Sequence, residues 1–196
     1  MMDLPGRDIN TLLEKITNYD KDERYMATMD LGALLSRAGS GGPPVDTNTE
    51  RRAAAAILGR LDDPSNDVQS VAVKTLSALF VRVGPGLAGD AAHKLSDSVT
   101  DASRPELRDV YAIGLRSLVK DVPEACGPAV CVAAVRALLR GLTSDDDGMR
   151  AACCDVFTDI LGRFGSCGDV VEAAGEIGDA CLGIVRGEEG GDAVVR

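Results

Sequence analysis

The side chains of this sequence with the most obvious chemical potential are its thiols, because cysteine can act as a nucleophile, a redox group or a metal ligand. All six lie in the C-terminal half of the 196-residue chain: Cys126, Cys131, Cys153, Cys154, Cys167 and Cys181. No two of them form the C-x-x-C pair that is typical of a zinc site or a thioredoxin-like redox site. We therefore interpret them as free thiols in a reducing compartment. A thiol-dependent enzyme or sensor is the alternative interpretation.

Other candidates for catalysis or metal binding are few. His93 is the only histidine, and no cysteine or carboxylate stands at a recognisable ligand spacing from it, so we expect a surface or packing residue. The run from Asp145 to Gly148 begins like a calcium loop but lacks the alternating ligands and the later glutamate, and it predicts a helix N-cap. No phosphate loop of the form G-x-x-x-x-G-K-[ST] is present. We therefore expect no catalytic residues, metal, cofactor or small-molecule substrate, and a protein that is not an enzyme.

The composition is that of a folded protein with a mainly aliphatic core. Hydrophobic residues make up 45% of the chain and charged residues 27%, whereas aromatic residues make up 3%. Such a core suits closely packed helices better than it suits aromatic-rich β-sandwiches. The net charge of −10 argues against a nucleic-acid partner, since phosphate binding needs clustered Lys and Arg. No uninterrupted run of about 18 apolar residues is present, so we expect no membrane partner.

A repeat organises the chain. Five residues, which we call anchors, each close a short polar segment: Arg24, Gln69, Arg108, Arg150 and Arg196. Their separations are 45, 39, 42 and 46 residues, close to the roughly 40–47 residues of HEAT and armadillo units. The anchors therefore predict a repeat protein of that kind.

Apolar residues follow the first four anchors at shared offsets of three, seven, ten, eleven and fourteen residues. In the order of these offsets they are Ala27, Ala72, Tyr111 and Cys153; Leu31, Leu76, Leu115 and Phe157; Leu34, Leu79, Leu118 and Ile160; Leu35, Phe80, Val119 and Leu161; Ala38, Val83, Val122 and Phe164. Offsets of seven, ten, eleven and fourteen lie along one side of a helix with 3.6 residues per turn. Each anchor therefore opens an amphipathic helix, which we call a B helix.

A second apolar segment precedes each anchor and predicts an A helix that folds back on its B partner. Breaks rich in glycine or proline separate successive pairs at 39–44, 84–86, 123–128 and 165–168. The sequence thus predicts an all-α fold, an α-α superhelix of the HEAT/armadillo solenoid type with about four and a half two-helix repeats. We expect one solenoid domain over 1–196, with repeats at approximately 8–38, 49–83, 87–122, 129–164 and 168–196. Since the fifth repeat is incomplete, we expect a truncated, N-terminal piece of a longer protein.

Three stretches carry a further signal, and the first of them contains residues that helical periodicity alone does not require. They are residues 12–17 with 20–28, residues 67–74, and residues 106–110 with 113–115. On these residues the chain resembles the N-terminal HEAT repeats of the cullin-associated, neddylation-dissociated protein family. The likeness is continuous from about Ile9 to Val122 and thins to pattern beyond it. The chain departs from the family at residues 39–44 and in its glycine-rich fifth repeat.

The resemblance implies a scaffold that binds an unneddylated cullin with its RING subunit and promotes exchange of substrate receptors, in the assembly of SCF-type ubiquitin ligases. In that family the N-terminal repeats lie against the cullin C-terminal region and the RING protein, and adaptor displacement belongs to far C-terminal repeats. A cytoplasmic and nuclear location is also implied. The alternative is another HEAT or armadillo scaffold, such as a nuclear transport receptor or a phosphatase regulatory subunit.

The first anchor segment is the candidate partner-binding site. Its residues are Asp20, Lys21, Asp22, Arg24 and Tyr25. A structural interpretation competes with this one, because acidic residues favour a helix N-terminus and the arginine can join a ladder of stacked repeats. Polar turns that border a helix are usually solvated caps, so the structural interpretation is favoured.

Overall fold

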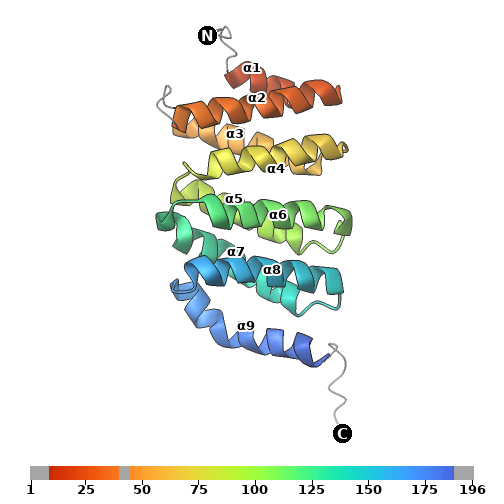
Figure 1. Ribbon diagram of the computed structural model, residues 1–196, viewed down its shortest axis with the longest axis vertical. Coiled ribbons are helices and arrows are strands. Elements are labelled where there is room, and N and C mark those ends of the chain that lie inside the picture. Colours follow the sequence, from red (N-terminus) through yellow and green to blue (C-terminus); the bar gives the residue numbers. More distant parts are fainter. Residues whose placement is uncertain (1–8, 40–44, 188–196) are drawn as a thin grey trace. The chain divides into compact units, whose positions relative to one another are not determined.

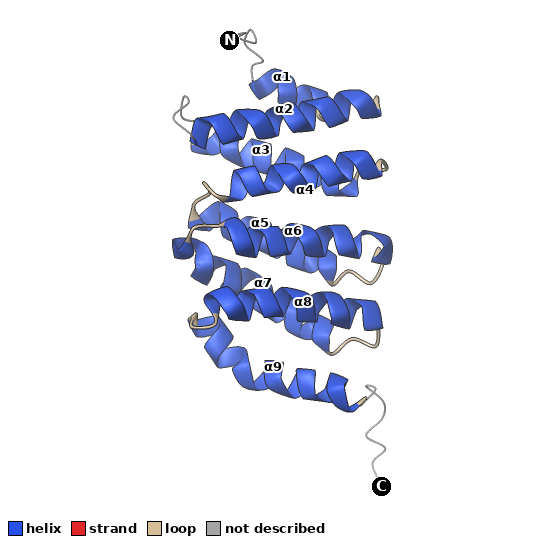
Figure 2. Cartoon of the chain, in the orientation of Figure 1, coloured by secondary structure: helices blue, strands red, loops and turns tan. Residues whose placement is uncertain are grey.

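The computed structural model describes residues 9–39 and 45–187, and every regular element within these ranges is a helix (Figure 2). The predicted all-α class is thus confirmed for the part of the chain that the structure describes. The chain divides into two compact units, Met1–Val83 and Gly84–Arg196, which are described separately below. The placement of both units in one solenoid domain stays a prediction.

The first unit contains two successive helix pairs. Its helices are α1 (Ile9–Lys15), α2 (Lys21–Gly39), α3 (Thr47–Gly59) and α4 (Asn66–Phe80), with a 3₁₀ turn at Arg60–Asp62. Helix α1 packs on α2, α3 packs on α4, and the two B helices α2 and α4 pack on each other (Figure 1). The apolar stripe of each B helix is therefore covered from two sides.

The second unit contains two further pairs followed by one A helix. Its helices are α5 (Pro85–Val99), α6 (Arg108–Asp121), α7 (Gly127–Leu142), α8 (Asp147–Phe164) and α9 (Gly168–Arg186), with 3₁₀ turns at Pro105–Leu107 and Glu124–Cys126. A helices pack on A helices (α5 on α7, α7 on α9) and B helices on B helices (α6 on α8). The predicted helical-repeat fold of about four and a half helix pairs is thereby confirmed.

Local sequence explains where several helices begin. Asp146 caps α8, its Oδ1 accepting a hydrogen bond from the Met149 backbone N–H at 3.0 Å, as the acidic run predicted. Helix α5 starts with Pro85, whose missing N–H costs nothing at the first helical position. Helix α3 begins at Thr47, because Asp46 accepts hydrogen bonds from the backbone N–H groups of Asn48 and Thr49.

The repeated apolar positions form most of the core of each unit. Every described residue at offsets three and seven from its anchor is buried, including the bulky Leu31, Leu76, Leu115 and Phe157. Leu161, at offset eleven, is a correction, because 44% of its surface is exposed. Helices α2 and α6 each pack against the next B helix, whereas no B helix follows α8 among the described residues. Ala38 lies outside the residues whose side chains the structure describes.

Two glycines allow helices to approach closely. A Cβ atom at Gly32 of α2 would lie 2.9 Å from Thr75 Oγ1 of α4. A Cβ atom at Gly141 of α7 would collide with Cys153 Sγ of α8 and would lie 3.0 Å from Thr100 Cγ2. Both positions therefore exclude larger side chains by direct contact.

Candidate functional site

The anchors close the turn that joins an A helix to its B helix. Nη1 of Arg24 donates to the carbonyl oxygens of Asn18 and Tyr19 at 3.0 and 2.8 Å. Two later anchors likewise donate to the carbonyl six residues upstream, Gln69 to Asp63 O at 2.8 Å and Arg150 to Ser144 O at 2.6 Å. The repetition of a long polar donor at this position is thus explained by the turn itself. Arg196 lies outside the described residues.

Arg24 also links the first helix pair to the second. Its Nε and Nη2 donate to Oδ2 and Oδ1 of Asp63 at 2.7 and 2.8 Å, the forked geometry that suits a carboxylate. The Asp63 side chain is fully buried, and the Arg24 side chain is 9% exposed. Arg60 lies 3.2 Å from the same carboxylate. The pair therefore occupies the interior of the first unit, and the guanidinium of Arg24 is already engaged.

The environment of Asp63 stabilises its ionised form. Burial alone would raise the pKa of this carboxyl group. Hydrogen bonds from Arg24 and from the Ser65 backbone N–H, with the charges of Arg24 and Arg60, outweigh burial and lower the pKa below its usual range. Asp63 is therefore a permanent anion near neutral pH, which fits a structural ion pair and not a proton donor.

A second pair of the same kind lies in the other unit. Nη2 of Arg108, which is buried, donates to Oδ2 of Asp146 at 2.8 Å. The Asp146 side chain is 41% exposed and also caps α8, so a hydrogen bond from the Met149 backbone N–H is the largest cause of its lowered pKa. The anchors Arg24 and Arg108 thus both reach the turn of the following repeat, at separations of 39 and 38 residues.

The sequence reasoning missed a second set of arginines at the opposite end of the B helices. Arg82 donates to Leu35 O at 2.8 Å and to Glu50 Oε1 at 3.0 Å. Arg163 donates to the carbonyl oxygens of Val119 and Val122. Both arginines stand thirteen residues after their anchors, a recurrence that could have been found from the sequence. They satisfy carbonyl groups at the C-terminal end of the preceding B helix.

The predicted partner-binding residues separate into buried and exposed groups. Arg24 is buried in the ion pair, and Asp20 caps α2 by accepting a hydrogen bond from the Asp22 backbone N–H at 2.8 Å. Lys21, Asp22 and Tyr25 are exposed. These three line a depression of about 260 Å³ between the N-terminal ends of α2 and α4, together with Ser65, Asp67 and Val68. This depression is therefore the part of the candidate site that a partner can reach.

Helix α2 carries exposed apolar residues beside that depression. Tyr25, Met26 and Met29 are 36%, 45% and 40% exposed. The equivalent positions of α4 one and five residues after its anchor are the polar Ser70 and Lys74, both exposed. The repeat itself therefore does not require apolar side chains at Tyr25 and Met29, whereas Met26 stands at a position that is also apolar in α4, where Val71 is buried.

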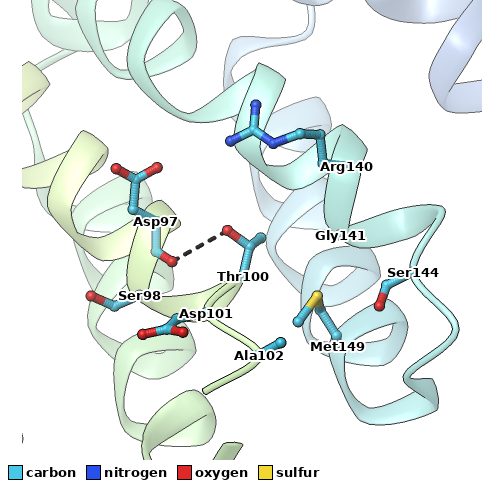
Figure 3. A pocket seen from close by; sticks show the side chains of 9 residues that line it. All are labelled: Asp97, Ser98, Thr100, Asp101, Ala102, Arg140, Gly141, Ser144 and Met149. Carbon is cyan, nitrogen blue, oxygen red and sulfur yellow. Dashed lines mark hydrogen bonds between the residues drawn. The ribbon is translucent and has the colours of Figure 1, made fainter. Parts of the chain in front are cut away.

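A larger hollow lies in the second unit, beside the turns that precede α6 and α8. Figure 3 shows its two walls, one from the end of α5 with Asp97 and Asp101, the other from α7 and α8 with Arg140 and Met149. Its volume is about 640 Å³. Side-chain and backbone hydrogen bonds from Ser103 lower the pKa of Asp101, so this carboxyl group is not poised to donate a proton. The hollow therefore presents charged and polar side chains suited to binding, and no acid–base pair is evident among the residues that line it.

Among the described residues four of the thiols lie in two hydrogen-bonded pairs, Cys131 with Cys167 and Cys154 with Cys181, and burial raises the pKa of Cys131 and of Cys154. Burial raises the pKa of the Cys131 and Cys153 thiols to about 12 in each case, which suppresses the thiolate that reactivity needs. His93 lies on the surface of α5, with Nδ1 3.2 Å from Asp97 Oδ2. No group of three or more metal-ligating side chains occurs in the ranges that the structure describes.

One described segment, Glu124–Leu142, is long and apolar enough to cross a membrane by length and composition alone. It includes α7, and 61% of its apolar window is buried inside the protein. Helix α7 packs against α5, α8 and α9, so its role in the core accounts for its composition.

Comparisons with known proteins give one recurring family. Cullin-associated NEDD8-dissociated protein 1 of Arabidopsis thaliana is 30% identical over 162 residues, and its counterpart protein 2 of Mus musculus is 31% identical over 164 residues. Each match covers 81% of this chain and 13% of the relative. The chain thus spans about an eighth of the length of these relatives.

A third match concerns a named part of such a protein. The N-terminal part of cullin-associated NEDD8-dissociated protein 1 of Emericella nidulans is 38% identical over 77 residues, which cover 39% of this chain and 23% of that protein. No family model matches the chain. The crystal structure of an engineered protein superposes with a TM-score of 0.49 and 16% identity, over 87% of this chain and 69% of that one, too weakly to support a conclusion. The resemblance predicted from the sequence is nevertheless confirmed by the named relatives: this chain is a helical-repeat protein similar to the N-terminal part of the cullin-associated NEDD8-dissociated proteins.

Proposed function

We propose that this chain is a non-catalytic scaffold that binds an unneddylated cullin together with its RING subunit. The observation that carries the proposal is the sequence similarity to cullin-associated NEDD8-dissociated proteins over 81% of the chain. The successive helix pairs supply extended helical surfaces of the kind on which repeat proteins bind other proteins. The raised pKa values of the buried Cys131 and Cys153 thiols fit residues with a packing role.

The chain is proposed to bind its partner without acting alone as an exchange factor for substrate receptors. It spans 13% of each of the two named relatives, so most of the surface of those relatives has no counterpart in this sequence. Solenoid binding sums many modest contacts along a surface, and a short array therefore binds more weakly than a long one. We further propose that the protein works in the cytoplasm and the nucleus, which microscopy of a fluorescently tagged chain would test.

The direct test is a pull-down with the purified chain as bait. The prey is a recombinant cullin with its RING subunit, supplied either unmodified or carrying NEDD8 on the cullin. We expect capture of the unmodified complex and weaker capture of the neddylated one. Failure to capture either complex, with recovery of a small GTPase or a phosphatase catalytic subunit from a lysate, would contradict the proposal and favour another class of HEAT scaffold.

A further inference from the structure

The exposed face of α2 is apolar at two positions, Tyr25 and Met29, where the equivalent positions of α4 are polar and exposed. Met26 directly follows Tyr25, and Met29 lies four residues after Tyr25 and three after Met26. The three side chains are therefore neighbours on one helix surface. Each keeps more than a third of its surface in solvent. Ser70 and Lys74 occupy the α4 positions that match Tyr25 and Met29, whereas Met26 matches Val71, which is buried. An exposed apolar cluster rimmed by polar residues is typical of a protein interaction site.

The side-chain types also fit an interface. Methionine is unbranched and polarizable and adapts to varied partners, and tyrosine supplies a large, rigid contact with few rotatable bonds. Tyr25 lines the depression of about 260 Å³, so an inserted side chain would contact both the ring and the α4 residues opposite. The cluster thus has an adaptable surface and an adjoining recess.

The charges around this cluster favour a basic partner segment. Asp20, Asp22 and Asp67 are exposed, and Lys21 is the one cation in the lining of the depression. Glu23 is nearby but is already paired with Lys15 at 3.2 Å. The whole chain carries a net charge of −10. A partner segment with lysine or arginine beside its apolar residue therefore complements this surface, and an acidic segment does not.

We propose that Tyr25, Met26 and Met29, with the adjoining depression, form a docking site for a basic partner segment that inserts one large apolar side chain between the N-terminal ends of α2 and α4. The inference rests on the proposed function, since it assigns that segment to the cullin–RING partner. It extends the candidate site from the turn to the exposed face of α2 and removes Arg24 from the direct contacts.

The test measures binding of the full chain to the unmodified cullin–RING complex by biolayer interferometry. We expect the double variant Met26→Ser/Met29→Ser to raise Kd at least tenfold. The control Ser70→Ala/Lys74→Ala, at the exposed α4 positions that match Tyr25 and Met29, should change Kd by less than twofold. Circular dichroism melting of each variant checks that the changes leave the fold intact, which we expect because all four side chains are exposed.

A second variant addresses the charges. Asp22→Lys/Asp67→Lys should slow association about tenfold at low ionic strength, and the difference from the unchanged protein should shrink at high salt. A purely structural role of these exposed residues would produce no such salt dependence. This variant also keeps the test decisive if the methionine substitutions disturb folding.

The outcomes separate the two proposals. No capture by the unchanged chain overturns the proposed function and, with it, this assignment of the partner. Capture by the unchanged chain with Kd values within twofold for both variants overturns the docking site alone. Light scattering that shows a dimer of the unchanged chain and a monomer of the methionine variant also overturns it, because the face would then bind a second copy.

Discussion

Removing the side chain of Arg24 should destabilise the protein by about 3 kcal/mol, because it leaves the buried carboxylate of Asp63 without its main partner. In Arg24→Ala the fully buried Asp63 carboxylate loses both hydrogen bonds of the forked pair. Breaking a buried ion pair by deleting one partner typically costs about 3–5 kcal/mol. Arg60, with Nη1 3.2 Å from Asp63 Oδ2, retains part of the compensation, so the expected cost lies at the lower end of that range.

Urea unfolding followed by far-ultraviolet circular dichroism measures this difference. For a chain of this size the melting temperature should fall by about 6–12 °C. The matched control is Arg24→Met/Asp63→Leu, which removes both charges and should cost only about 1–2 kcal/mol, because the carbonyl groups of Asn18 and Tyr19 still lose a donor. A single variant as stable as the unchanged protein, or a double variant as unstable as the single one, would refute the reasoning.

Acid should weaken the same pair. The pKa of Asp63 is lowered in the folded state, whereas an unfolded aspartate has a pKa of about 3.9. The unfolded chain therefore binds the proton more readily, and the stabilisation is fully present above about pH 5 and is lost progressively as the pH falls below that. Arg24→Met/Asp63→Leu should consequently lose less stability than the unchanged protein between about pH 5 and pH 3.

Three further predictions concern packing, helix ends and thiols. Gly141→Ala should destabilise the protein by about 1–3 kcal/mol in urea unfolding because its Cβ meets Cys153, whereas Gly175→Ala, with nothing within 4 Å, should stabilise by about 0.5–1 kcal/mol. Arg163→Met should cost about 1–2 kcal/mol, measured in the same way, because the carbonyl groups of Val119 and Val122 lose a donor. Iodoacetamide at pH 8, followed by mass spectrometry, should label Cys153 only after denaturant is added, because its pKa is raised to about 12. Rapid labelling of Cys153 in the folded protein would revive the thiol-based alternative.

The helices and their buried faces could be predicted because both follow from local spacing. A stripe at offsets of three, seven, ten and eleven residues can be buried only on one side of a helix, and Leu31, Leu76 and Leu115 are all fully buried. Leu161 shows the limit of the pattern. It belongs to the same stripe, but its exposure depends on whether another helix covers it, and the spacing of one helix carries no information about that.

The polar links between repeats could be predicted only in part. The recurring anchors were visible in the sequence, and the structure gives their reason in the turn carbonyls and in Asp63. The partner of Arg163 is a backbone carbonyl 44 residues away, and any residue type can supply a carbonyl. No side-chain pattern can therefore identify that contact, although the arginine itself recurs thirteen residues after an anchor.

The first anchor segment contains both a buried structural residue, Arg24, and an exposed residue, Tyr25, so a test of its binding role must change one without the other. Arg24 holds the turn carbonyls and the buried Asp63, while Tyr25 beside it faces the solvent on α2. A loss of partner binding in Arg24→Ala would therefore report a disturbed turn and a shifted α2 as readily as a lost contact. Substitutions at Met26 and Met29 leave the ion pair in place and change only the exposed face. Binding that survives them but fails in Arg24→Ala would assign the whole segment to structure, in agreement with the interpretation of the polar turn as a cap.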